Sequence, residues 1–547
     1  MYHKIVTVIF IFLLTLSSLS ILSVGDAQEE EIKIEWNRPI HFLGPQKTLV
    51  LMVEFSDVRI RASIQKVEEI VNIVNRFIKS SSYGKTWLDY YIYPKVITLP
   101  KNMAYYGGPS PGAQRGDDNA RSLEFKYLAI KFFKEKSGKD ITEFKHIIIV
   151  HAGGDEATSG SPNDIWSHCM MSKPLYLLGE MYGLDTIYEM LKRQGPEYQM
   201  IADILMHKKP DGGWHLIAGV ETVAEEDVPS VMMHEFTHSM WIYDHYVYSK
   251  DGYSAGSEVG VWTNMDSGPF LDPPVDIDGW SKYLLGWIEA VEVKEDGEYI
   301  IHTLDKPDEP HGIIIPINEE EYYFIHARRP VGQDAALPSP GVLLFKINKY
   351  RSRNVEGEPY MVSLLDANLG TPPECKTLDK RYIRLCETLD APYYDYNHYR
   401  GQWSGLGRLG SYAINLLTEE VTTEEGYYIK VTEFDGSKGI AKVYISLEGE
   451  PAEETEEDTE PDKEVTIITR TLTGTYTETI YTTVTTHGTV TKSIIVTVTV
   501  APPPRIESFT DYLSIIIILA AVIIVFVMII FRKKAPLPPP PPQYPPW

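Results

Sequence analysis

The sequence has 547 residues, of which 43% are hydrophobic, and a formal net charge of −25 at pH 7. A chain of this length is expected to form two or three domains, with ample apolar material for a core. The negative charge excludes a protein that tracks nucleic-acid phosphates, so no nucleic acid is expected among its partners. Three cysteines in so long a chain exclude a disulfide scaffold.

The two ends of the chain predict its compartment. Residues 1–27 combine a positive charge, an apolar run and a small-residue cleavage pattern, which is typical of a secretory signal. Residues 511–531 contain an uncharged apolar run long enough to span a bilayer, and three basic residues follow it at once. We therefore expect a single-pass cell-membrane protein with an extracellular head and a cytoplasmic proline-rich tail at 532–547.

Strands and helices alternate in the region 28–287. Thr48–Phe55 and His146–His151 are typical of buried strands. Ser63 is a candidate cap for a helix that follows it, and a second helix is expected over Ala120–Ser137. This alternation predicts an α/β layer.

A further strand is expected at Gly219–Ala224, shortly before a helix start marked by Pro229. If this strand lies at the edge of the sheet, a substrate peptide can pair with it.

The pattern H-E-x-x-H occurs at His234, Glu235 and His238. On a helix, residues four apart share a face, so both imidazoles can reach one metal ion. Zinc suits this pair, because imidazole nitrogens bind it at about 2.0–2.1 Å. Glu235 is then placed to take a proton from a metal-bound water.

A catalytic zinc needs a third protein ligand and an open position. A straight helix would carry His245 about 10 Å from His238, so the helix must end near Trp241 and the chain must fold back. Asp244 has the third-ligand spacing and is our prediction, with His245 in reserve. Glu258, the rival placed as in thermolysin-like enzymes, ranks lower because two glycines flank it.

The pattern changes after residue 288, where short apolar runs alternate with Gly, Pro and Asp turns. This predicts an all-β, sandwich-like domain over 288–448, to which the sequence assigns no chemistry. Residues 449–510 are expected to be an acidic linker and a threonine-rich, O-glycosylated stalk. A pair of strands is the alternative for the threonine-rich part, because its alternation is strict.

The cysteines leave two questions open. Cys375 and Cys386 are close enough in sequence to close a short disulfide loop, and free thiols are the alternative. Cys169 is expected to be a buried inert thiol rather than a thiolate that gates the metal.

Several stretches together resemble one family, the immune inhibitor A-like secreted zinc metalloproteases, which are zincin- or metzincin-like enzymes. These stretches are LVLMVEFSDV (49–58), SYGK (82–85), IIIVHAGGDEA (147–157), IWSH (165–168), HEFTHSMWIYDHY (234–246), GVWTNMDSG (260–268), SKYLLGW (281–287) and YYFIHARRPVGQDAALPSPGVLLFKIN (322–348). The resemblance implies a zincin-like catalytic domain over 28–287 and hydrolysis of peptide bonds in protein or peptide substrates.

The same resemblance implies roles for single residues. Zinc is expected at His234, His238 and Asp244, with Glu235 as the catalytic general base that acts on a zinc-activated water. Met265 corresponds to the methionine turn under the metal, although a methionine there is also typical of core packing. Structural calcium is common in such secreted enzymes, but no position in this chain is singled out for it.

The sequence leaves the turn at Trp241 and the oxyanion-stabilising residue unassigned. Family members usually have glycine where Trp241 stands, so we expect the tryptophan to make the turn at negative φ, or the turn to lie elsewhere. No oxyanion-stabilising residue is chosen among Tyr246, His245 and Tyr253. The competing interpretation of the whole chain is a catalytically inactive surface structural or binding protein on the same fold. Its oligomeric state is left open.

Overall fold

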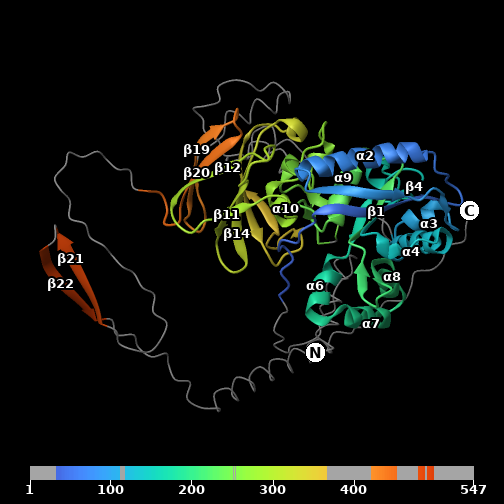
Figure 1. Cartoon of the computed structure of the whole chain (residues 1–547), viewed down its shortest axis with the longest axis horizontal. Coiled ribbons are helices and arrows are strands. Elements are labelled where there is room, and N and C mark those ends of the chain that lie inside the picture. Colours follow the sequence, from blue (N-terminus) through green and yellow to red (C-terminus); the bar gives the residue numbers. More distant parts are fainter. Residues whose placement is uncertain are drawn as a thin grey trace, which may run out of the picture. The chain divides into compact units, whose positions relative to one another are not determined.

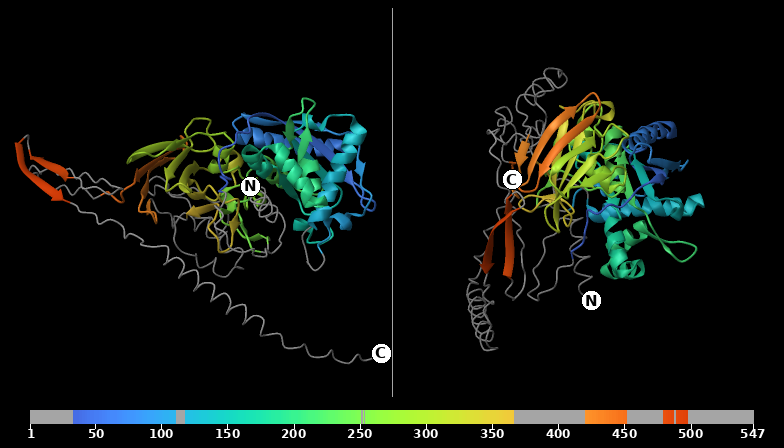
Figure 2. Two further views of the ribbon diagram at one scale, coloured as in Figure 1. Left: turned by 90° about the horizontal axis from the view of Figure 1, so that it is seen from below. Right: turned by 60° about the vertical axis from the view of Figure 1, so that its left-hand side comes forward.

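The computed structural model describes residues 33–110, 118–250, 252, 254–365 and 420–451, together with the strands 479–486 and 489–497. The chain divides into two compact units, Met1–Pro451 and Ala452–Trp547 (Figure 1, Figure 2). The predicted signal segment, the pair Cys375 and Cys386, and the apolar segment 511–531 lie outside the described residues. Within the described ranges, no helix is both long enough and apolar enough to cross a membrane.

The first unit is a mixed α/β structure with several sheets, and its described residues form nine α-helices. The strands of the α/β region are β1 (Gly44–Glu54), β2 (Thr86–Ile92), β3 (Ile97–Thr98), β4 (His146–His151), β5 (His168–Met171), β6 (Met206–Lys208), β7 (Trp214–Leu216), β8 (Gly219–Ala224), β9 (Val247–Tyr248) and β10 (Ser254–Gly256). The helices are α2 (Ile64–Ser81), α3 (Met103–Gly107), α4 (Asn119–Ser137), α5 (Glu156–Ser159), α6 (Lys173–Tyr182), α7 (Leu184–Gln194), α8 (Pro196–Leu205), α9 (Pro229–Ser239) and α10 (Gly279–Leu284).

The main sheet has six strands in the order β2-β1-β4-β8-β5, with β3 also paired to β1. All its pairs are parallel except β5–β8, which is antiparallel. The strand predicted at Gly219–Ala224 is therefore present as β8, but it lies between β4 and β5, so the condition for a substrate peptide to pair with it is not met. Strand β5 pairs with the outer side of β8 and is the edge strand of the described sheet.

Helices cover both faces of this sheet, so its central strands β4 and β8 are buried on both sides (Figure 1). Val50 and Met52 of β1 join a core cluster with α2 and α9, whereas Leu49 and Leu51 join a second cluster with α4 and α8. This is the period of two expected of a strand.

The predicted helix ends are confirmed. The Ser63 side chain caps α2 by accepting a hydrogen bond from the N–H of Lys66 at 3.2 Å. Gly138 ends α4 in the left-handed conformation, at φ 69°.

After residue 288 the described chain forms mostly strands. They are β11 (Ala290–Glu292), β12 (Gly297–His302), β13 (Gly312–Pro316), β14 (Glu321–Arg328), β15 (Gly341–Asn348), β16 (Asn354–Val355), β17 (Val362–Leu365), β18 (Glu420–Thr422), β19 (Tyr428–Asp435) and β20 (Ile440–Ser446). A five-stranded sheet, β11-β13-β14-β15-β17, and a four-stranded sheet, β12-β20-β19-β18, share a core cluster.

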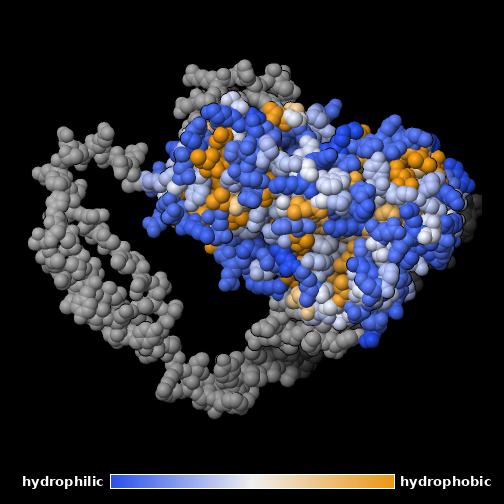
Figure 3. Space-filling model, in the orientation of Figure 1, coloured by the Kyte–Doolittle hydropathy of each residue, from blue (hydrophilic) through white to orange (hydrophobic). Residues whose placement is uncertain are grey.

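The other face of the five-stranded sheet does not face solvent. Phe324, Leu343 and Phe345 of this sheet belong to the same core cluster as Phe236 of α9. The two domains predicted on either side of residue 288 are thus joined by one continuous core. In the view of Figure 3, hydrophilic residues predominate on the surface and hydrophobic residues gather in separate patches.

In the second unit, β21 (Thr479–Thr486) pairs antiparallel with β22 (Thr489–Thr497). The threonine-rich segment therefore contains a pair of strands, the alternative that its strict alternation had suggested.

Candidate metal centre

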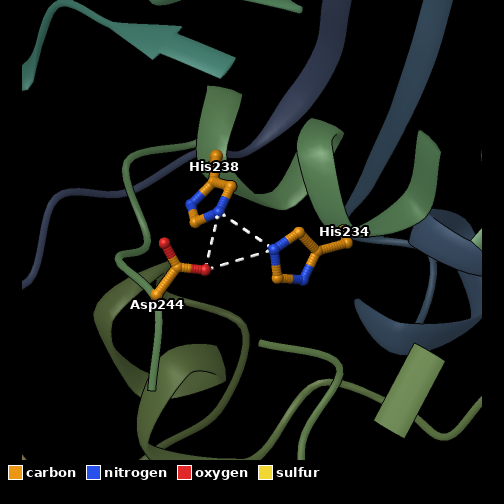
Figure 4. Close-up of side chains that lie close together, drawn as sticks. All are labelled: His234, His238 and Asp244. Atoms are coloured by element: carbon orange, nitrogen blue, oxygen red, sulfur yellow. Dashed lines mark hydrogen bonds and ion pairs between the residues drawn. The ribbon is translucent and has the colours of Figure 1, made fainter. Parts of the chain in front are cut away.

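Helix α9 carries the H-E-x-x-H pattern, as predicted. It begins with Pro229 in its first turn. Proline lacks an N–H, but a residue at this position would have no intrahelical acceptor for one. His234 and His238, four residues apart, present their Nε2 atoms to each other at 3.1 Å (Figure 4). The side chains of the two histidines are only 14% and 8% exposed. The helix therefore supplies two imidazole nitrogens that converge on one point.

The chain turns sharply where the helix ends, and Trp241 makes this turn. Its φ is +71°, in the left-handed region that costs an L-residue about 1–2 kcal/mol. The prediction that a tryptophan would turn at negative φ, or that the turn would lie elsewhere, is wrong. Trp241 takes the conformation that glycine adopts without cost.

Contacts on every side hold Trp241 in place. Its indole N–H donates to the carbonyl of Ala218 at 2.8 Å, and its own carbonyl accepts from the Lys173 ammonium at 2.9 Å. Its ring packs edge-on against Phe42 and at a tilt on Tyr176, with centroids 5.2 and 4.9 Å away. Burial of so large a ring offsets the backbone strain, because it is worth roughly 3–5 kcal/mol.

The turn brings Asp244 back to the histidine pair. Its Oδ1 lies 3.2 Å from Nε2 of His234 and 3.1 Å from Nε2 of His238 (Figure 4). Among the described residues, these three are the one group of His, Cys, Asp or Glu side chains whose ligand atoms converge closely enough to hold a metal ion. Ligands about 2.0–2.1 Å from a tetrahedral zinc ion stand about 3.3–3.4 Å apart, close to the observed separations.

Hydrogen bonds on the far side of each ring determine which nitrogen carries the proton. His234 Nδ1 donates to the carbonyl of Asn264 at 2.8 Å, and His238 Nδ1 donates to the carbonyl of Ile242 at 2.7 Å. In each neutral ring Nε2 is then an acceptor. Two nitrogen lone pairs and a buried carboxylate oxygen without a hydrogen-bond donor face one another. Three converging acceptors fit a bound cation.

The electrostatics of the centre follow from burial and proximity. Burial raises the pKa of Asp244, but the adjacent His238 and His234 outweigh it and hold that pKa well below its usual value. Burial lowers the pKa of His238, and Asp244 more than reverses this effect. The carboxylate therefore stays ionised.

Glu235 lies on the same helix in a different environment. Its side chain is buried, and its Oε2 finds no hydrogen-bond partner in the part of the chain that the structure describes. Burial raises its pKa to about 8, partly offset by His234. A carboxyl group in such a setting can both accept and return a proton near neutral pH.

Tyr248 orients Asp244 and was missed by the sequence reasoning. Its hydroxyl donates to Oδ2 of Asp244, the oxygen that does not face the histidines. The Tyr246 hydroxyl lies 3.1 Å from that of Tyr248. Tyr246 therefore contacts the outer side of the site, and Tyr253 lies outside the described residues.

The two rival third ligands do not join the group. The buried ring of His245 turns away, with Nδ1 3.4 Å from Oδ2 of Asp278 and Nε2 3.5 Å from the Ser281 hydroxyl. Glu258 lies in a segment whose backbone N–H groups bind the Asp266 carboxylate, with its own N–H 2.9 Å from Oδ2. Of the three candidates, only Asp244 lies with His234 and His238.

Met265 lies in the core, whereas Cys169 is half-buried. Met265 is fully buried, and its carbonyl accepts the N–H of His245 at 2.9 Å, one residue after the carbonyl that orients His234. Cys169 lies opposite Glu221 in the β5–β8 ladder, and burial raises its pKa well above the usual value. The raised pKa keeps the thiol protonated near neutral pH, so it is poorly suited to gate the metal as a thiolate, as expected.

The chain matches no protein-family model, and no curated protein is detectably similar to it.

Proposed function

We propose that this protein is a zinc-dependent endopeptidase. One observation carries the proposal: Nε2 of His234, Nε2 of His238 and Oδ1 of Asp244 lie within 3.2 Å of one another. Two imidazoles and a carboxylate are a donor set found in catalytic zinc sites, which keep a further position open. The zincin-type fold and the resemblance to the immune inhibitor A-like family belong to this proposal.

Each residue has a role in the proposed reaction. A bound zinc ion would polarise the substrate carbonyl and acidify a water molecule. Glu235, beside the first ligand, accepts the proton of the attacking water and passes it to the leaving amine. Its burial favours this exchange, since its pKa of about 8 lies near neutral pH.

The substrate strand is proposed to lie along β5 rather than β8. In the described sheet β8 lies between β4 and β5, so its backbone groups are already paired. Strand β5 ends the sheet and packs beside α9, and an extended peptide can add to such an edge by backbone hydrogen bonds.

The cellular placement rests on the sequence alone. A signal at 1–27 and a span at 511–531 would hold the catalytic unit outside the cell, with the tail at 532–547 inside. Protease added to intact cells should remove the head and leave the tail protected. Loss of the tail epitope under the same conditions would contradict this topology.

The test of the reaction uses the full-length chain purified in mild detergent. Elemental analysis comes first, because the same donor set also binds ferrous iron in other enzymes. We expect about one zinc ion per chain and hydrolysis of unfolded casein. Glu235→Gln should keep the metal and lose about 10²- to 10⁴-fold of the activity, as is typical when a general base is removed.

Glu69→Gln, an exposed change on α2, is the matched control and should keep both properties. A chain that binds no metal contradicts the proposal. Bound zinc with equal activity in wild type and Glu235→Gln would favour the surface binding protein.

A further inference from the structure

The two oxygens of the Asp244 carboxylate have different surroundings. Oδ1 faces Nε2 of His234 and Nε2 of His238 at 3.2 and 3.1 Å. Oδ2 accepts a hydrogen bond from the Tyr248 hydroxyl. A carboxylate with both oxygens free can bind one cation through both of them. The hydrogen bond on Oδ2 removes that freedom.

The hydroxyl protons have only one consistent arrangement. A tyrosine has a single hydroxyl proton, and that of Tyr248 is used toward Asp244. The Tyr246 hydroxyl, 3.1 Å away, must then be the donor to the Tyr248 oxygen. The chain of donors runs from Tyr246 to Tyr248 to Asp244, and each bond polarises the next.

The backbone holds Tyr248 from both sides. Strand β9 pairs with β10 on one side and with β16 on the other, where Val355 lies opposite Tyr248. The Tyr248 carbonyl also accepts the N–H of Glu356 at 2.9 Å. The rings of Tyr246 and Tyr248 lie 5.0 Å apart. The hydroxyl of Tyr248 is thus fixed by strands and not by a flexible loop.

We propose that Tyr248, supported by Tyr246, is a positioning residue that keeps Asp244 a monodentate metal ligand. This inference rests on the proposed function, since it requires a metal at the centre. Its consequence is that one coordination position stays open for water and substrate. If Oδ2 were released, it would turn toward the metal and fill that position.

Cobalt(II) tests this without any measurement of activity, because its visible absorption weakens as the coordination number rises above four. The full-length protein is stripped of metal and titrated with Co²⁺. Tyr248→Phe should weaken the visible bands at saturation and raise the Co²⁺ dissociation constant by about 10- to 100-fold, the loss typical when a partner of a metal ligand is removed. Tyr246→Phe should change both in the same direction by a smaller amount.

Tyr243→Phe is the matched control. It makes the same change in the same segment, but the buried Tyr243 hydroxyl has no hydrogen-bond partner among the described residues. Its Co²⁺ spectrum should equal that of the wild type. Circular dichroism checks that each variant is folded, and Tyr246→Phe carries the test if Tyr248→Phe is not.

The outcomes separate the two proposals. A wild type that binds no Co²⁺ or Zn²⁺ overturns the proposed function and this inference with it. A wild type that binds metal, with a Tyr248→Phe spectrum identical to its own, overturns only the positioning role, even if the affinity falls. Equal changes in Tyr248→Phe and Tyr243→Phe would also overturn it, because the hydrogen bond would not be their cause.

Discussion

The candidate metal centre is built from two halves that differ in how they are held. Helix α9 supplies His234 and His238 through its own period, since they are only four positions apart. The segment from Trp241 to Tyr248 supplies Asp244, and its conformation depends on residues far away in the sequence. The geometry of one half of the site is therefore set by local sequence, and that of the other half by tertiary structure.

The distant partners of the second half come from three places. The β7–β8 connection provides the Ala218 carbonyl, and α6 provides the Lys173 ammonium, both to Trp241. Strand β16 of the β region pairs with β9, and Asn354 donates to the carbonyl of His245 at 3.0 Å. Changes at these partners should therefore weaken the metal centre without touching a ligand, and changes remote from them should not.

Asn354 should give the largest effect at a single pH. Its buried amide makes four hydrogen bonds, to the backbone of His245, Met361 and Val362. Asn354→Ala should lower the free energy of unfolding by about 2–4 kcal/mol, because several buried backbone groups lose their partners. Urea denaturation with and without zinc measures it, and zinc affinity should fall as well.

Asn318→Ala, an exposed change in the same β region, is the control and should cost less than about 1 kcal/mol. If Asn354→Ala loses stability while its zinc affinity equals that of the wild type, the segment is not held from the β region in the way described.

Lys173 should give a pH-dependent effect. Burial, with a smaller contribution from Arg38, lowers its pKa from the usual 10.5 to about 7. Between these values the unfolded chain binds the proton and the folded chain does not, so rising pH favours folding. This one group should add up to about 1.4 kcal/mol per pH unit to the free energy of unfolding across pH 7 to 10.5.

Lys173→Met isolates that contribution. Relative to the wild type, the variant should have its greatest advantage below pH 7, and the advantage should shrink as the pH approaches 10.5. Denaturation curves at several pH values, with metal held constant, measure the difference. A difference that does not change with pH would mean that the folded-state pKa of Lys173 is not lowered.

Trp241 should give the smallest effect, read from a pair of variants. Trp241→Gly and Trp241→Ala both lose the buried ring, but only alanine keeps the strain of positive φ. Strain relief of about 1–2 kcal/mol, less the entropy cost of glycine of about 0.5–1 kcal/mol, should make Trp241→Gly more stable by about 0.5–1 kcal/mol. Equal stability of the two variants would show that the turn relaxes to negative φ once the ring is removed.

The same division explains what the sequence could predict. The helix, its two histidines and the caps at Ser63 and Gly138 follow from local patterns, and the structure confirms them. Asp244 follows from spacing together with the argument that the helix must end. Each of these inferences uses residues within one turn or one short segment.

The features that the sequence did not predict depend instead on residues that lie far apart in the chain. The conformation of Trp241 depends on Ala218 and Lys173, which no local pattern connects to it. The position of β8 within the sheet could not be predicted, because nothing in the sequence shows that β5 pairs beside it. Asn354 acts through contacts that form only when β9 and β16 meet, about a hundred residues apart in the chain. Tyr248 contacts Asp244 only four residues away, but β16 holds its backbone in place.

The pairing of β9 with β16 limits where the chain can be truncated for expression. A fragment that stops near residue 290, where the strand-rich region begins, would contain every proposed ligand and yet leave one side of β9 bare. Such a fragment should aggregate through that exposed ladder or bind metal poorly. A piece meant for expression should extend past Ser446, because β20 pairs with β12, and residue 288 is not a place to divide the chain.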